Sequence, residues 1–174
     1  YSNWLPSAHV NYDLNEDTKV RASITTAVSR PGYNEARASA GISPVNQSVS
    51  GGNPYLEPEE SWGLDLAYEW YFGEASIFAV SAFYREVDNV IVAGSTTVDG
   101  SVYSPSAQPG EQWTLSGSAN GKNGELTGIE LNFIDRLDHY MTGPLSGFGV
   151  ELNLAAIDSS FTAPDGNEYS LPGT

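Results

Sequence analysis

The sequence predicts an all-β fold, a set of antiparallel strands that forms part of a transmembrane β-barrel, and three observations support this prediction. Apolar and polar residues alternate with a period of two over several long segments. The connections between these segments are alternately short and long. Aromatic residues gather at the ends of the segments. Two faces of different polarity are what a barrel between lipid and a wet lumen requires.

Six segments carry the alternation, at residues 7–14, 19–29, 61–72, 76–92, 125–133 and 148–156. The clearest is 61–72, where Trp62, Leu64, Leu66, Tyr68, Trp70 and Phe72 alternate with Ser61, Gly63, Asp65, Ala67 and Glu69. Segment 76–92 is less regular, and we assign Phe78, Val80, Ala82 and Tyr84 to its outer face. The opposite faces carry charged residues, among them Lys19, Arg21, Glu130 and Glu151. Such residues suit a lumen that holds water or a plug.

The connections indicate the architecture more strongly than the strands. Short turns are expected at 15–17, 73–75 and 141–146, and long structureless loops at 31–60, at 93–124 and after Ser160. Connections in compact domains have a median of about 4–6 residues. Outer-membrane barrels instead have short periplasmic turns and long extracellular loops. The first strand is therefore predicted to run from outside toward the periplasm.

Aromatic residues mark both expected membrane boundaries. Those near the short turns are Tyr12, Tyr68, Trp70, Tyr71, Phe72, Tyr140 and Phe148, and those near the long loops are Trp4, Trp62 and Tyr84. Amphipathic rings form belts at the two interfaces of membrane proteins. The same rings could instead fill the core of a β-sandwich, but the polar residues on the opposite faces argue against that alternative.

Composition and motifs exclude several functional classes. There are 7 Lys and Arg against 22 Asp and Glu, so the chain lacks the basic footprint that nucleic acids require. Cysteine is absent, and the two histidines, His9 and His139, show no metal-ligand pattern. Neither a nucleophile elbow nor a phosphate loop occurs. We expect no catalytic residue, no metal and no cofactor, and hence no enzyme.

The long loops contain residue types that bind small molecules. Aromatic rings stack on ligand rings, and amides and charged groups hydrogen-bond to polar ones. The candidate ligand contacts in the extracellular loops are Arg30, Tyr33, Asn34, Arg37, Tyr103 and Trp113. The plainer interpretation is that exposed loops simply have this composition.

An ordered set of motifs resembles the TonB-dependent outer-membrane receptors. Ser29-Arg30-Pro31 closes a strand, and Gly52-Asn53-Pro54-Tyr55-Leu56-Glu57-Pro58-Glu59-Glu60-Ser61 opens the next. The set continues with Trp4-Leu5-Pro6-Ser7, Tyr12-Asp13-Leu14, Phe83-Tyr84-Arg85-Glu86-Val87-Asp88-Asn89-Val90-Ile91 and Gly124-Glu125-Leu126-Thr127-Gly128-Ile129-Glu130-Leu131. We interpret Pro31 and Gly52-Asn53-Pro54 as structural, because proline ends ladder pairing and such a turn precedes re-entry into the sheet.

The resemblance implies a location and a role. Residues 1–174 would be a fragment of a single β-barrel domain, from its C-terminal part, with the plug domain and the remaining strands outside this sequence. The protein would lie in the bacterial outer membrane, in contact with lipid, and would import a scarce nutrient: siderophore-iron, cobalamin or an oligosaccharide. The TonB complex would supply energy through an N-terminal region that is absent here. The alternatives are a soluble β-sandwich adhesin, a carbohydrate-binding module or a barrel-type outer-membrane enzyme.

Overall fold

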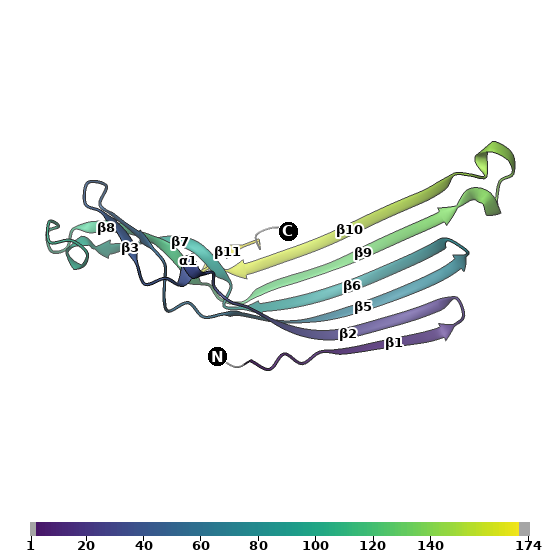
Figure 1. Ribbon diagram of the computed structural model, residues 1–174, viewed down its shortest axis with the longest axis horizontal. Coiled ribbons are helices and arrows are strands. Elements are labelled where there is room, and N and C mark those ends of the chain that lie inside the picture. Colours follow the sequence, from purple (N-terminus) through teal and green to yellow (C-terminus); the bar gives the residue numbers. More distant parts are fainter. Residues whose placement is uncertain (1–2, 171–174) are drawn as a thin grey trace.

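The computed structural model describes residues 3–170, which form two sheets (Figure 1). A long seven-stranded sheet carries a smaller four-stranded sheet at one end. Among the described residues, no helix is long and apolar enough to cross a membrane.

The seven-stranded sheet has the order β1-β2-β5-β6-β9-β10-β11, and every pair in it is antiparallel. Its strands are β1 (Ala8–Asn15), β2 (Thr18–Ser29), β5 (Glu59–Gly73), β6 (Ser76–Asp88), β9 (Gly124–Arg136), β10 (Gly149–Thr162) and β11 (Glu168–Tyr169). The six predicted strands are thus confirmed, with one change. The predicted segment 76–92 is two strands, because Asn89 has a φ of 60° that interrupts the extended chain before β7.

The register confirms the assignment of faces. Leu64 is opposite Tyr84, and Leu66 is opposite Ala82. Residues directly opposite in an antiparallel pair point to the same side of the sheet, so the chosen residues of β6 share the apolar face of β5. The exposed members of that face include Val10, Tyr12, Ile24, Leu64, Leu66, Ile129, Leu152 and Leu154. A face so apolar and so exposed requires an apolar covering.

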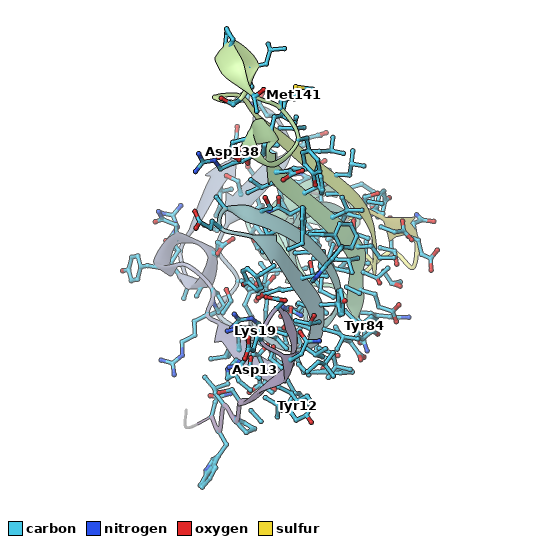
Figure 2. All side chains as sticks on the ribbon, turned by 90° about the vertical axis from the view of Figure 1, so that its right-hand side faces the viewer. Tyr12, Asp13, Lys19, Tyr84, Asp138 and Met141 are labelled. Atoms are coloured by element: carbon cyan, nitrogen blue, oxygen red, sulfur yellow. The ribbon has the colours of Figure 1, made fainter. Side chains whose placement is uncertain are left out.

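The opposite face is polar and joined by ion pairs. Arg21 binds Glu69 with a nitrogen–oxygen distance of 2.7 Å. Arg85 binds Asp65 at 2.7 Å, and Ser23 Oγ donates to the same carboxylate at 2.8 Å. In Figure 2, which looks along the strands, Tyr12 and Tyr84 lie toward one side of the sheet, and Asp13 and Lys19 toward the other. The alternation in the sequence therefore produces one apolar and one charged surface.

The two long connections are folded, contrary to the expectation that they lack structure. The first contains α1 (Tyr33–Ala36), β3 (Ala40–Ser43) and β4 (Ser48–Gly51), and the second contains β7 (Ile91–Asp99), η1 (Gly100–Val102) and β8 (Gln112–Asn120). The four strands form one sheet of order β3-β4-β8-β7. We call this unit the loop sheet. It forms because β4 and β8, far apart in sequence, pair in parallel, and such pairing leaves no local pattern.

The third connection at the opposite end is longer than predicted. β1–β2 and β5–β6 are joined by tight turns, whereas residues 137–148 join β9 to β10 through η2 (Leu137–His139) and η3 (Gly143–Leu145). All three connections lie at the end of the sheet away from the loop sheet (Figure 1).

Candidate ligand-binding surface on the long connections

A groove of about 900 Å³ lies against the loop sheet and the segment that follows β10. Its lining combines small, aromatic and polar residues. The small ones are Ala40, Gly51, Gly52, Ala93, Gly94, Gly117 and Ala119, the aromatic ones are Tyr55, Tyr103, Phe161 and Tyr169, and the polar ones include Asn53, Ser95, Thr96, Ser116 and Asp165. A volume of this size is in the range that small-molecule sites occupy.

The small residues let the backbones of the loop sheet form the floor of the groove. A Cβ atom at Gly117 would lie 2.8 Å from the carbonyl oxygen of Gly51. That distance is too short for any side chain, so the parallel pairing of β4 with β8 depends on glycine at this position. The loop sheet therefore contributes a surface with few large side chains, and Tyr55, Tyr103 and Tyr169 add aromatic rings to the lining.

Trp113 lies in the interior of the loop sheet and does not match the ligand contact expected of it. The side chain is 1% exposed and packs with Val49 and Ala107. Its Nε1 donates to Glu111 Oε1 at 2.9 Å. A Cβ atom at Gly100 would collide with the indole ring. Trp113 is thus a core residue, and the physical reason is that the two long connections fold over it.

The structure brings only one of the other candidates to the groove. Tyr103 lines it, together with Tyr55 and Tyr169. The remaining candidates, Arg30, Tyr33, Asn34 and Arg37, are exposed but lie on α1 and its flanks, outside the groove lining. Their segment touches the groove indirectly, since backbone oxygens from residues 34, 35 and 37 lie 2.6–2.8 Å from a Cβ atom placed on Gly52.

Asn120 attaches the loop sheet to the long sheet. Its Oδ1 accepts from the Glu57 amide at 2.9 Å, and its Nδ2 donates to the carbonyl oxygens of Glu57 at 2.9 Å and Asn89 at 2.8 Å. Close by, Glu59 Oε1 accepts from the Ile91 amide at 2.8 Å. These bonds join the first long connection to the second.

An apolar cluster joins the same unit to the end of β10. Val90, Phe161 and Ala163 are buried against one another. Backbone bonds run from Lys122 N to Thr162 O at 2.8 Å and from Gly121 N to Val90 O at 2.7 Å. The groove therefore lies between the loop sheet and the chain after β10, and both are anchored to the long sheet.

Two acidic residues of the loop sheet have structural partners. The amide N–H of Gln108 and the indole N–H of Trp113 donate to Glu111 and lower the pKa of its carboxyl group. Ser101, through its hydroxyl and its amide, donates to Asp99 and lowers the pKa of that carboxyl group. Both groups are ionised at neutral pH and stabilise the turn between β7 and β8.

Sequence reasoning missed two residues of the groove wall. Asp165 and Tyr169 follow Ser160, in the segment expected only to be a long loop. The Asp165-Gly166-Asn167 run was a usable turn signal, and here the Asn167 amide and side chain donate to Asp165. Nothing local identified Asn120, because its two partner residues, Glu57 and Asn89, lie in distant segments.

A comparison with protein families identifies the chain's relatives. The family model described as "TonB dependent receptor-like, beta-barrel" matches residues 1–174. The comparison with curated proteins found no match.

Solved structures of siderophore receptors share the fold. The ferric enterobactin receptor PfeA of Pseudomonas aeruginosa matches with a TM-score of 0.68 and 20% identity, covering 89% of this chain and 22% of the receptor. The siderophore receptor PirA of the same organism matches with a TM-score of 0.61 and 19% identity, covering 92% of this chain and 31% of the receptor. PirA of Acinetobacter baumannii matches with a TM-score of 0.54 and 16% identity, covering 91% and 26%. The chain thus spans less than a third of each of these receptors. Because the family's β-barrel model matches all of residues 1–174, the chain belongs to the TonB-dependent receptor family.

Proposed function

We propose that this chain is part of a bacterial outer-membrane receptor that imports a scarce nutrient with energy from the TonB complex. The observation that carries the proposal is a sheet with one continuous apolar face and one ion-paired face, in a chain that matches a receptor barrel. Residues 1–174 would be a fragment of a single barrel domain, and the plug and the remaining strands would be supplied by sequence outside it. A soluble β-sandwich is not favoured, because its apolar faces would be buried in a core.

Aromatic clusters at both ends of the strands support a membrane-spanning position. Near the loop sheet, the rings of Trp62 and Tyr84 lie 5.4 Å apart. Near the tight turns, the ring centroid of Phe72 lies 5.0 Å from that of Trp70 and 5.9 Å from that of Phe133. Amphipathic and aromatic rings stabilise barrels at the two lipid–water boundaries. With these boundaries, β1 would run from outside to the periplasm and the loop sheet would lie outside the cell.

Among the possible cargoes, we favour siderophore-iron over cobalamin and oligosaccharide. The matched structures support this choice, since they are receptors for siderophores and PfeA was solved in complex with enterobactin. We propose that Tyr103, together with Tyr55 and Tyr169, contacts the ligand in the groove. Arg30, Tyr33, Asn34 and Arg37 would meet it farther out. The chain would perform no covalent chemistry and would need no resident cofactor, and its other partner would be outer-membrane lipid.

Uptake by the full-length receptor tests this function. A strain lacking the receptor would be supplied with the receptor or with its Tyr103→Ala variant, and uptake of ferric siderophores, cobalamin and oligosaccharides would be measured with and without TonB. We expect TonB-dependent uptake of a ferric siderophore by the receptor and slower uptake by the Tyr103→Ala variant. Val102→Ala, at an exposed neighbouring side chain, is the matched control. Uptake of none of the three classes, or uptake that persists without TonB, would contradict the proposal.

Cysteine labelling tests the assignment of the two faces. Since the chain has no cysteine, Leu66→Cys and Asp65→Cys introduce single probes on adjacent residues of β5. We expect the probe at 66 to report lipid and the probe at 65 to report an aqueous environment. The reverse pattern would show that the faces are assigned wrongly, and a fully water-soluble protein would favour the β-sandwich.

A further inference from the structure

The connection between β9 and β10 differs from the other two connections at its end of the sheet. β1–β2 turns through Glu16 and Asp17, and β5–β6 turns through Glu74 and Ala75. Residues 137–148 instead form two short 3₁₀ turns and extend past the two tight turns (Figure 1). We call this segment the β9–β10 connection. Its length alone does not indicate a role, but its side chains do.

Large apolar side chains of the β9–β10 connection are exposed. The exposed fractions are 67% for Tyr140, 41% for Met141, 55% for Leu145 and 60% for Phe148. The two tight turns, by contrast, carry mainly acidic residues. Four large apolar groups on one short segment form a patch of the kind that marks a contact with lipid or with another protein.

The strand register places Phe148, at the end of this patch, in line with the apolar face of the sheet. The amide of Leu137 donates to the carbonyl oxygen of Phe148 at 2.9 Å, which extends the ladder one pair beyond Arg136 and Gly149. Phe148 is therefore in phase with Val150 and Leu152, whose side chains are exposed on the apolar face.

The charged residues of the connection lie on the other side. Arg136 and Asp138 form an ion pair with a nitrogen–oxygen distance of 2.7 Å, and Arg136 has the phase of the charged face. In Figure 2, Asp138 lies toward the side of Asp13 and Lys19, and Met141 toward the side of Tyr84. The connection thus continues both surfaces of the sheet beyond its last paired residues.

Internal hydrogen bonds hold the connection in this shape. The amides of Tyr140 and Met141 donate to Leu137 O at 3.1 and 2.9 Å, and Ser146 Oγ donates to Gly143 O at 2.8 Å. Gly143 has a φ of 81°, and Pro144 follows it at the start of η3. A segment already ordered in this way loses little conformational freedom when its apolar groups become buried.

We propose that the β9–β10 connection is an interfacial anchor, which inserts Tyr140, Met141, Leu145 and Phe148 into the headgroup region of the periplasmic leaflet. This inference rests on the proposed function, because it takes the apolar face of the sheet as the lipid-facing one. Lipid is favoured over a protein partner because Phe148 continues that face and Met141 lies toward the same side. Aromatic and aliphatic side chains on an amphipathic segment are also what the membrane interface accepts.

The test compares probe environments in the full-length receptor. Spin labels would be attached through Leu145→Cys in the patch, Glu74→Cys in a tight turn at the same end, and Leu66→Cys at mid-strand. The receptor would be reconstituted in vesicles of phosphatidylethanolamine and phosphatidylglycerol. Collision rates with oxygen, which concentrates in lipid, and with a water-soluble nickel chelate would then be measured. We expect a lipid-like ratio at 145 and 66 and a water-like ratio at 74.

Each other outcome has a distinct meaning. A water-like ratio at 145 with a lipid-like ratio at 66 would overturn the anchor and leave the membrane-spanning sheet intact. Protection of 145 from both reagents would also overturn it, in favour of a protein contact. A water-like ratio at 66 would overturn the proposed function and the anchor together. Retained folding of each variant would be checked by the heat-dependent shift of the barrel in gel electrophoresis.

Discussion

Replacing Trp113 by alanine should unfold the loop sheet while leaving the long sheet folded. The indole is 1% exposed and lies at the centre of a small cluster with Val49 and Ala107. Val98, Tyr103 and Leu115 pack around this cluster. A core so small has few other contacts to compensate for a cavity, whereas the long sheet is held by its own ladders.

The expected magnitude follows from the burial of this side chain. Burying an aromatic side chain of about 150–250 Å² at about 25 cal/mol per Å² stabilises by roughly 4–6 kcal/mol. Measured truncations of buried tryptophan or phenylalanine to alanine cost about 3–5 kcal/mol. At about 1.4 kcal/mol per factor of ten, the range of about 3–5 kcal/mol corresponds to a loss of roughly 10²- to 4 × 10³-fold in the stability of the loop sheet toward local opening.

Hydrogen exchange measures this local stability. In the Trp113→Ala variant, the amides of β7 and β8 should exchange faster by that factor, while the amides of β5, β6 and β9 keep their protection. Val102→Ala is the control, because Val102 is 76% exposed and surface substitutions change stability by about 0.5 kcal/mol or less. Unchanged protection of β8 in the tryptophan variant would refute the assignment of Trp113 as the core of this sheet.

Three further predictions concern the same unit. Asn120→Ala removes three hydrogen bonds to backbone groups, so the Glu57 amide should lose hydrogen-exchange protection equivalent to about 1–3 kcal/mol. An unchanged exchange rate of that amide would mean that Asn120 does not hold the loop sheet in place. The folded state lowers the pKa of the Glu111 carboxyl group, so the ionised group stabilises the fold fully when the pH is above its ordinary pKa of 4.5. This stabilisation is lost as the pH falls through the lower pKa of the folded state. Proteolysis of the loop sheet should therefore accelerate with acid, and Glu111→Gln should weaken that dependence. Gly117→Val places a side chain against Gly51 O, 2.8 Å from the Cβ position, and should separate β4 from β8 and slow ligand uptake more than Gly94→Ala, whose Cβ meets nothing within 4 Å.

The strands and their faces could be predicted because their signal is local. In β5, the alternation from Trp62 to Phe72 determines which side chains share a face, whatever the neighbouring strands are. The tight turns were equally readable, since Asn15 to Asp17 and Gly73 to Ala75 are short breaks between regular segments. The exception was β6, which ends at Asp88 because the left-handed residue Asn89 interrupts the predicted segment 76–92. Asparagine adopts that conformation readily, but its presence does not require it.

By itself, the sequence determined that the chain is a row of antiparallel strands with one apolar and one charged face, because side-chain direction along a strand depends only on adjacent residues. Only the tertiary structure decided what the long connections do. The parallel pairing of Val49 with Leu115 joins two loops, and it converts Trp113 from an expected ligand contact into a core residue. It also creates the groove that Tyr103 and Tyr169 share. These features depend on which distant segments meet, and the energy of such contacts is absent from any local pattern.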